Sequence, residues 1–348
     1  MYKILIIIFF ILSSSACENE HNNPALNKKA TWISNAFKTI ESGNYPKIKA
    51  IAWWHENFDN TFLKINSTQA SLDAYKTGVA SNLFIITPEF KNNKLIKSEK
   101  GIYHSAYPNF GGTEDIVTTK RIADFETLAG KKIVWAYFSN NWYNKITFPT
   151  KAVNTIHSVG KIPFIRIMPR TDFTENLPDT NYTMQKIIDG KFDNELTQWA
   201  KDAAKTGIPI LAEFGTEVNG NWFPWSGQYN GGSITDNYGD SDFPDGPERF
   251  RDAYRHIIEI CNENNANNIT WFFHVDAYSE PDAEWNTPKD YYPGDKYIDW
   301  IGVSIYGPQE ENEDYQEFSE ILNDIYPKLI KISDKPIAIL EFAITEIE

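Results

Sequence analysis

The sequence predicts an α/β fold and, within that class, a single-domain (β/α)8 barrel (a TIM barrel), on three observations. Eight short apolar runs recur along the chain, amphipathic stretches lie between them, and no linker interrupts residues 30–348. Nearly continuous apolar runs are typical of strands that are buried on both faces of a parallel sheet. Eight such strands that alternate with helical stretches favour a closed barrel over an open sheet.

The expected strands share short length and a high content of β-branched and aromatic residues. In chain order they are Ile48–Trp54, Ile102–Tyr107, Ile133–Phe138, Ile162–Met168, Pro209–Phe214, Ile269–Val275, Ile298–Ile305 and Pro336–Phe342. Between them, Phe192–Lys205 and Arg249–Cys261 repeat apolar residues at helical spacing. The long segment 219–247 is expected to form a loop at the C-terminal face, where barrels of this kind do their chemistry.

The N-terminus carries a targeting pattern. Lys3 precedes nine apolar residues, Ile4–Leu12, a run too short for a membrane span of about 20 residues but typical of a signal peptide. Small residues before Cys17 resemble a bacterial lipoprotein signal, in which the cysteine is acylated. We therefore expect a signal peptide over residues 1–16, a lipidated tether over 17–29 and a place in the cell envelope or at the cell surface; plain secretion is the alternative.

Composition excludes several classes of function. The chain has 33 basic and 47 acidic residues, a formal net charge of −14, so a nucleic-acid partner is not expected. Two Cys and six His form neither a four-cysteine zinc site nor a His-Glu-x-x-His motif, and the P-loop and Gly-x-Ser-x-Gly patterns are absent. No metal or cofactor is expected. Aromatic residues make up 15% of the chain, which favours a cleft for sugar rings.

Two carboxylates follow or close predicted strands. Glu217 comes just after Pro209–Phe214, and Glu341 lies in Pro336–Phe342. Both should therefore lie at the C-terminal face of the barrel. Cleavage of a glycosidic bond needs such a pair, because one carboxyl protonates the leaving oxygen while the other attacks or activates water. Trp222 and Trp225 follow Glu217 and are expected to act as platforms for sugar rings.

Three segments resemble glycoside hydrolase family 26, which contains mostly β-mannanases with some xylanases and lichenases, in a retaining clan of (β/α)8 barrels. They are Asn219-Gly220-Asn221-Trp222-Phe223-Pro224-Trp225 behind Glu217, Tyr291–Gly302 with Tyr306, and Lys335–Phe342. The resemblance implies that Glu217 is the acid/base, Glu341 the nucleophile and Tyr306 its hydrogen-bond partner. It implies a retaining endo-β-glycanase that acts on a polysaccharide, with β-mannan as the first substrate.

Two residues depart from the family pattern. Family members usually carry His immediately before the acid/base, where this chain has Thr216, and often Arg four residues before it, where this chain has Glu213. Arg166 is expected to supply the missing cation near the nucleophile. Glu213 is an alternative acid, but the Asn-Gly-x-Trp loop is registered to Glu217.

Other residues near strand ends are candidates for substrate binding. One of Trp53, Trp54 and His55 should point into the cleft, since they close a predicted strand. For Trp142 and His274, ligand contact and structural hydrogen bonding are equally open. The full set of expected substrate-binding residues is Asn219, Trp222, Trp225, Trp53, His55, Arg166, Trp142 and His274.

Two other classes of function fit the same residues. A glycan-binding surface lipoprotein would keep the aromatic cleft but have lost turnover through the changes at Thr216 and Glu213. A transglycosylase would transfer the glycosyl group to an acceptor sugar. Release of reducing sugar distinguishes a hydrolase from a binding protein, and the sizes of the products distinguish it from a transferase.

The order of elements predicts a barrel that is circularly permuted relative to the family. Glu341 is expected on the family's seventh strand, yet only residues 342–348 follow it. The missing pieces match the N-terminal part: 26–40 as the seventh helix, Ile48–Trp54 as the eighth strand and 68–80 as the last helix. Closure then requires Ile48–Trp54 to pair with both Pro336–Phe342 and Ile102–Tyr107. The alternative is a truncated barrel with an open, seven-stranded sheet.

Overall fold

The computed structural model describes residues 27–58, 60–310 and 313–346, so Cys17 and the expected signal peptide lie outside the described residues. Eight parallel strands form a closed barrel, as predicted. They are β1 (Ile48–Trp54), β5 (Ile102–Tyr107), β6 (Trp135–Asn141), β7 (Ile162–Met168), β8 (Ile210–Phe214), β9 (Ile269–Asp276), β10 (Trp300–Tyr306) and β11 (Ile337–Ala343).

The barrel closes through its first strand. In β1, Ile51 pairs with Ile339 of β11 on one side and with His104 of β5 on the other. The predicted closure is therefore confirmed, and the open, seven-stranded alternative is wrong. Strands that pair on both edges leave no exposed sheet edge, which explains why residues from both ends of the chain are needed for the barrel.

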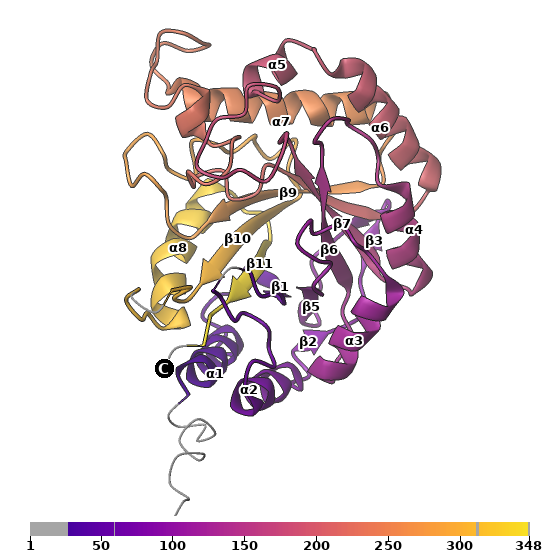
Figure 1. Cartoon of the computed structure of the whole chain (residues 1–348), viewed down its shortest axis with the longest axis vertical. Helices are drawn as coiled ribbons and strands as arrows, with labels where there is room; N and C mark the ends of the chain where they lie inside the picture. The colour runs from indigo at the N-terminus through magenta and orange to yellow at the C-terminus, as the bar shows by residue number, and fades with distance from the viewer. Residues whose placement is uncertain (1–26, 59, 311–312, 347–348) are drawn as a thin grey trace, which may run out of the picture.

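Helices surround the strands (Figure 1). The amphipathic segments predicted as helices form α1 (Lys28–Glu41), α2 (Gln69–Val79), α6 (Asp193–Thr206) and α7 (Asp245–Glu263). The others are α3 (Thr119–Ala129), α4 (Thr150–Ser158), α5 (Met184–Ile188), α8 (Phe318–Ile332) and a 3-10 turn, η1 (Gly227–Asn230). The connection from β7 to β8 holds both α5 and α6, whereas residues 277–299, between β9 and β10, hold no helix. That connection is free to form a wall of the cleft described below.

A small hairpin covers the N-terminal end of the barrel. Its strands are β3 (Phe90–Lys91) and β4 (Lys94–Leu95), and the two-residue strand β2 (Phe84–Ile85) adds to the start of β5. The amide of Leu95 donates to the Thr270 hydroxyl at 2.8 Å, and the Trp300 indole donates to the Leu95 carbonyl at 3.1 Å. This end is thus closed by packing, and the opposite end remains for the chemistry.

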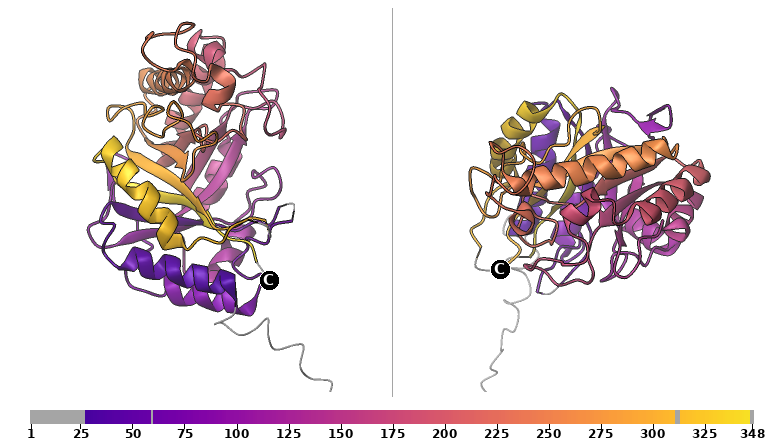
Figure 2. Two further views of the ribbon diagram at one scale, coloured as in Figure 1. Left: turned by 90° about the vertical axis from the view of Figure 1, so that its left-hand side faces the viewer. Right: turned by 90° about the horizontal axis from the view of Figure 1, so that it is seen from above.

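The two ends of the described chain meet beside α1 and α2 (Figures 1 and 2). The Glu346 carboxylate accepts hydrogen bonds from the amide of Asn27 and the hydroxyls of Ser67, Thr68 and Ser71. Next to it, the fully buried ammonium of Lys29 donates to the backbone carbonyls of residues 62 and 64 and to the Ser67 hydroxyl. We call Asn27, Lys29, Ser67, Thr68, Ser71 and Glu346 the chain-end cluster.

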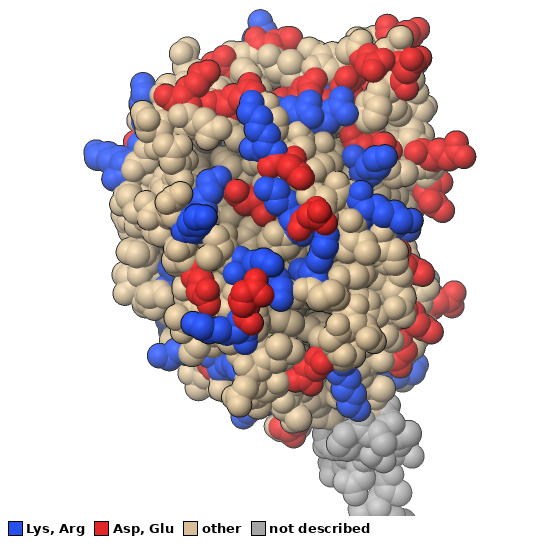
Figure 3. All heavy atoms as spheres, turned by 180° about the vertical axis from the view of Figure 1, so that it is seen from behind, with Lys and Arg blue, Asp and Glu red and all other residues tan. Residues whose placement is uncertain are grey.

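Charged side chains of both signs lie on the surface. Acidic and basic side chains are interspersed on the face opposite to that of Figure 1, and no basic stripe crosses it (Figure 3). Among the described residues, none of the helices combines the length and the apolar character that crossing a bilayer requires.

Candidate active site

A cleft of about 1040 Å³ lies at the C-terminal ends of the strands. Most of the strands contribute to it directly or through the loop that follows. Lining residues on the strands or just behind them are Trp54 of β1, Arg166 of β7, Glu217 after β8, Asp276 of β9, Tyr306 of β10 and Glu341 of β11. This is the face on which (β/α)8 barrels carry their catalytic groups.

Glu341 lies on β11 and is surrounded by donors. Tyr306 donates to one of its oxygens at 2.7 Å, Arg166 Nη2 lies 3.2 Å from the other, and the Tyr137 hydroxyl lies 3.4 Å from that same oxygen. Burial raises the pKa of Glu341, while Arg166 and the Tyr306 hydrogen bond act in the opposite direction. Arg166 and Tyr306 hold the carboxylate in one orientation and oppose its protonation, but burial outweighs them and the pKa of Glu341 is raised to about 7.

Glu217 reaches the same space from a strained turn. Gly215 and Glu217 both have positive φ, 62° and 51°, and a Cβ at position 215 would lie 2.7 Å from Phe250 and 2.9 Å from Trp225. Glycine is therefore required there, and the turn directs Glu217 over the barrel. The Trp222 indole donates to the carboxylate at 2.8 Å. Burial raises the pKa of Glu217, and the nearby Asp276 raises it further, which suits a group that must hold a proton.

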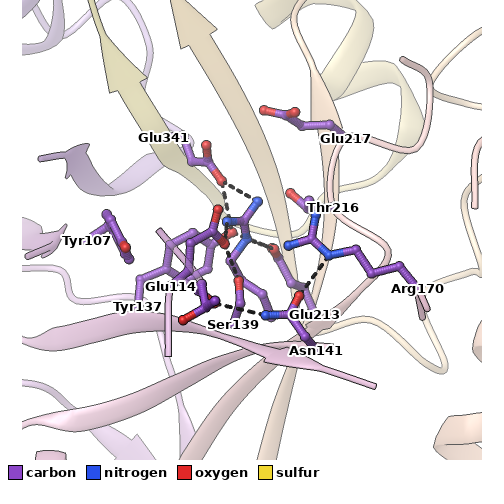
Figure 4. Close-up of polar contacts among 12 residues, drawn as sticks. Tyr107, Glu114, Tyr137, Ser139, Asn141, Arg170, Glu213, Thr216, Glu217 and Glu341 are labelled. Atoms are coloured by element: carbon purple, nitrogen blue, oxygen red, sulfur yellow. Dashed lines mark hydrogen bonds and ion pairs between the residues drawn. The ribbon is translucent and has the colours of Figure 1, made fainter. Parts of the chain in front are cut away.

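The two carboxyl groups face each other. Figure 4 shows Glu217 and Glu341 on opposite sides of one space, with Glu213 beneath them. One carboxylate oxygen of Glu217 and one of Glu341 lie within 4.8 Å of each other. Retaining glycosidases hold their carboxyl groups about 5–5.5 Å apart, and inverting enzymes about 6.5–9.5 Å. The spacing agrees with a retaining pair.

Arg166 contacts three carboxylates at the base of the cleft. Besides Glu341, its guanidinium contacts Glu114 at 2.7 Å and Glu213 at 3.5 Å, and it stacks over Trp54 at 4.9 Å from the ring centre. The side chain is almost fully buried. The expectation that Arg166 places a cation beside Glu341 is thus confirmed in position, and this cation comes from β7.

Glu213 is not in the cleft. Its side chain is fully buried, accepts from Tyr137, and lies 2.8 Å from His274 Nδ1. Burial raises the pKa of Glu213, but His274 and its hydrogen bond, together with Arg166 and Tyr137, outweigh burial and hold it below the usual value. A buried, ionised carboxylate without access to substrate cannot protonate a leaving group, so the geometry favours Glu217 over Glu213 as the acid.

One group of three side chains among the described residues has the spacing of a metal site: Glu217, His274 and Glu341. Both ring nitrogens of His274 already have partners, however. Nδ1 lies 2.8 Å from Glu213 and from the Thr216 hydroxyl, and Nε2 lies 2.9 Å from the Ser304 hydroxyl. The imidazole is therefore committed to the barrel interior in this arrangement.

The structure brings five of the predicted site residues together and separates the others from the cleft. Glu217, Glu341, Tyr306, Trp222 and Arg166 line it. The residues that do not line it are Trp53, His55, Trp142, Trp225, Asn219 and His274. Of the three candidates at the end of β1, it is Trp54 that faces the cleft.

The prediction of sugar contact is wrong for three tryptophans, because their side chains are 0–1% exposed. Trp53 donates to the Leu63 carbonyl, Trp225 donates to the Thr216 carbonyl, and Trp142 packs against Tyr182. Each indole therefore fills the core or holds a loop, and none offers a face to a ligand.

Two polar candidates are structural for a similar reason. The amide of Ile65 donates to His55 Nδ1, and burial lowers the pKa of His55 to about 3. Asn219 donates to the carbonyls of residues 276 and 278, and its side-chain oxygen accepts from the Asp276 amide. Asn219 thus fastens the loop after β9 to the loop after β8.

Three site residues were not predicted from the sequence: Tyr137, Asp276 and Ser304. Burial raises the pKa of Asp276, which lines the cleft beside Glu217, to about 7. Period-two alternation along β6 and β10 could have indicated Tyr137 and Ser304 as inward-facing. Nothing in the sequence separates their polar roles from those of other strand residues.

Comparison with known proteins agrees with the site. The sequence pattern of glycosyl hydrolase family 26 matches residues 170–335, which include Glu217 and Tyr306 and end before β11. Endoglucanase H of Acetivibrio thermocellus is 28% identical over 229 residues, covering 65% of this chain and 23% of that protein. A mannan endo-1,4-beta-mannosidase of Bacillus subtilis is 25% identical over 193 residues, covering 44% of this chain and 48% of that protein.

The solved structure of Bacillus subtilis mannanase man26 aligns with a TM-score of 0.43 and 18% identity over 64% of this chain and 74% of that one. The chain spans about a quarter of the length of the first curated relatives that it matches. The matched segment holds Glu217 with its tryptophan-rich loop and Tyr306, and over these residues the chain is similar to glycosyl hydrolase family 26.

Proposed function

We propose that the protein is a retaining endo-β-glycanase with β-mannan as its first substrate. The observation that carries this proposal is the facing pair Glu217 and Glu341, whose nearest oxygens lie within 4.8 Å in a large cleft. The mannosidase relatives support mannan as the first choice, and the endoglucanase and β-1,3-xylanase relatives make other β-linked glycans the second.

In the proposed mechanism Glu341 attacks the anomeric carbon while Glu217 protonates the departing glycosidic oxygen. Arg166 and Tyr306 hold the attacking carboxylate and favour its ionised form. Water then replaces the leaving sugar, Glu217 takes a proton from it, and the glycosyl–Glu341 ester is hydrolysed with overall retention. Trp222, which donates to Glu217, keeps the acid directed at the bond between the sugars.

The acidic side chains of the cleft favour a substrate without charged groups over an acidic glycan. Among the described residues, nine carboxyl groups line the cleft, against a single guanidinium, that of Arg166, which already contacts two of them, Glu114 and Glu341. A glycan with uronate or sulfate groups would meet like charge, with no further cation among the described lining residues to pair with, whereas a neutral chain would not. The lining acids are Glu56, Glu114, Glu175, Glu217, Asp276, Glu280, Glu313, Asp314 and Glu341.

We further propose that Cys17 is acylated and holds the enzyme at the cell envelope, with polysaccharide as its only other partner. The signal-like run Ile4–Leu12 and the small residues before Cys17 support this. More than one acyl chain is needed for firm anchoring. Cys17→Ser should move the protein from the membrane fraction to the soluble fraction, and equal partition of both forms would contradict lipidation.

A panel of mannan, xylan and mixed-linkage glucan tests the activity. We expect release of reducing ends from mannan first, oligosaccharides of several lengths as products, and retention of anomeric configuration. Glu341→Gln serves as the matched inactive control. Binding of a glycan without release by the wild type would support the binding-protein alternative, and products longer than the substrate would support the transglycosylase.

A further inference from the structure

Three fully buried side chains on adjacent strands form a hydrogen-bonded chain beneath the cleft. Glu213 of β8 lies 2.8 Å from Nδ1 of His274 on β9, and Nε2 of His274 lies 2.9 Å from the hydroxyl of Ser304 on β10. One ring nitrogen of His274 lies within 4.8 Å of a Glu217 carboxylate oxygen, and the Ser304 side chain acts on Glu217 by lowering its pKa. A continuous path therefore runs from a buried carboxylate to the proposed acid/base.

The arrangement has the connectivity of a Ser-His-acid triad, but it cannot act as one. Ser304 has no exposed surface and lies within a strand of the barrel, so no substrate carbonyl can reach its oxygen. What reaches the cleft is Glu217. The chain of contacts consequently acts on Glu217 and not on substrate.

Hydrogen bonding to Glu213 fixes a proton on Nδ1 of His274. Glu213 is an acceptor only, so His274 Nδ1 must carry a proton; if Nε2 also carries one, Ser304 accepts from it and its own proton is free for Glu217. Burial lowers the pKa of His274, but Glu213, with further contributions from Glu341 and Glu217, outweighs burial and raises it. The imidazolium form of His274 is thereby favoured relative to that of an ordinary histidine.

We propose that Glu213, His274 and Ser304 are positioning residues that orient Glu217 and set its affinity for protons, through a buried imidazolium and a serine hydroxyl. The inference rests on the proposed function of Glu217 and goes beyond it, because none of the three contacts substrate. It also involves Thr216, the residue before Glu217: His274 Nδ1 lies 2.8 Å from the Thr216 hydroxyl, so β9 brings an imidazole beside position 216.

Polar and charged groups surround the His274 imidazole. Besides Glu213, Thr216 and Ser304, the Tyr137 hydroxyl lies 3.3 Å from Nδ1, and the carboxyl groups of Glu217 and Glu341 lie nearby. Arg166 contacts Glu213 from the other side at 3.5 Å. The cation on His274 thus lies within 4.8 Å of a carboxylate oxygen of both Glu217 and Glu341, and its removal should raise the pKa of both.

The first test does not require activity. Nitrogen-15 NMR of the imidazoles, assigned with His274→Gln, should show His274 doubly protonated at pH 7.5 and neutral in Glu213→Gln. The buried His104 is the internal reference; burial lowers its pKa to about 4, so it should be neutral in both proteins. A neutral His274 in the wild type would overturn the proposal whatever the enzyme does.

The second test is the pH dependence of kcat/KM on mannan. Ser304→Ala should move only the basic limb, which reports protonated Glu217, to higher pH, since a side chain that lowers the pKa of Glu217 is lost. His274→Gln should move both limbs upward by about one unit or more. Loss of activity at all pH values with both limbs in place would overturn the proposal and indicate a purely structural role.

His104→Gln is the matched control for the loss of a buried imidazole. His104 is fully buried on β5 and contacts Tyr75 and the Lys132 carbonyl at 2.9 Å each, away from the cleft. Its replacement should leave both limbs in place. If His274→Gln does not fold, Ser304→Ala, which removes one hydroxyl, still decides the outcome. A wild type without activity on any glycan would contradict the proposed function, while the NMR result would still decide the charge of His274.

Discussion

Two clusters of buried charge lie in this barrel and differ in what satisfies them. In the cleft floor, defined as Arg166, Glu213, His274 and Glu341, each charge contacts groups of opposite charge. In the chain-end cluster, Lys29 donates to two carbonyls and a hydroxyl, and Glu346 accepts from hydroxyls and an amide. Burial lowers the pKa of Lys29 to about 7, and Glu346 only partly opposes that.

This difference indicates that the cleft floor serves catalysis, whereas the chain-end cluster holds the two ends of the described chain together. Charges that face charges change their proton affinity when one partner changes, as catalysis by a carboxyl pair requires. Charges that are satisfied by neutral groups hold segments together and respond little to a ligand. Substitutions in the cleft floor should therefore change activity more than stability, and substitutions in the chain-end cluster should do the reverse.

The largest effect is expected from Glu341→Gln. It removes the proposed nucleophile without changing the shape of the side chain, so kcat should fall by roughly 10⁴–10⁶-fold. The loss should persist with an activated leaving group, because the step that forms the glycosyl ester is abolished. Thermal unfolding should change little. Substantial turnover of an aryl glycoside by this variant would contradict the role of Glu341.

Glu217→Ala should reduce activity on polysaccharide by about 10²–10⁴-fold, since general acid and base catalysis are lost. With an activated leaving group the first step needs no acid, so added azide should restore turnover as a glycosyl azide. Glu213→Ala, on the adjoining strand β8, provides the comparison. A Glu217→Ala enzyme with full activity on polysaccharide, beside an inactive Glu213→Ala enzyme, would show that the acid is misassigned.

Lys29→Met tests the chain-end cluster. The folded state releases the Lys29 proton near pH 7, and the unfolded state near 10.5. The penalty for burying the cation is therefore complete below about pH 7, and the unfolding free energy of the wild type should rise between pH 7 and 10.5. The variant should lack this rise and lose about 1–3 kcal/mol at pH 9 through unpaired carbonyls.

Urea unfolding at pH 6.5 and 9 measures both effects. The value of kcat should match that of the wild type, because Lys29 lies outside the cleft lining. If the unfolding free energy of Lys29→Met depends on pH as that of the wild type does, groups other than Lys29 cause the dependence. The proposed difference between the chain-end cluster and the cleft floor would then be wrong.

The smallest effect is expected at the rim of the cleft. Tyr278 lines the cleft and is 45% exposed, so Tyr278→Ala should raise KM for long substrates by roughly fivefold, about 1 kcal/mol of lost stacking. Phe62→Ala is the control, because Phe62 is 54% exposed but does not line the cleft. Equal KM values for both variants on long and short substrates would exclude a sugar contact at Tyr278.

Strands were predicted more reliably than the directions of side chains. The apolar runs correspond to all eight barrel strands, since burial on both faces leaves little room for polar residues. The end of β1 shows this contrast: Trp53 was expected to bind substrate, but it is Trp54 that lines the cleft. Neighbouring strand residues point to opposite faces, and a one-residue difference in register decides which indole meets the cleft and which meets the core.

The order of elements led to two predictions, barrel closure and circular permutation, and their outcomes differ. Closure of the barrel through β1 is confirmed by its pairing with β5 and β11. The circular permutation relative to the family stays a prediction, because the family match covers only residues 170–335, between the two ends that the permutation concerns.

The sequence alone determined the barrel, its closing strand and the two carboxyl groups at its C-terminal face, because burial pattern and strand order are local properties that repeat along the chain. Tertiary structure decided which charges meet. Arg166, Glu213, His274 and Ser304 come from four different strands, and their contacts depend on strand stagger and on the left-handed turn at Gly215 and Glu217. Coulombic and hydrogen-bond energies change over a few ångströms, a distance that spacing along the sequence does not specify.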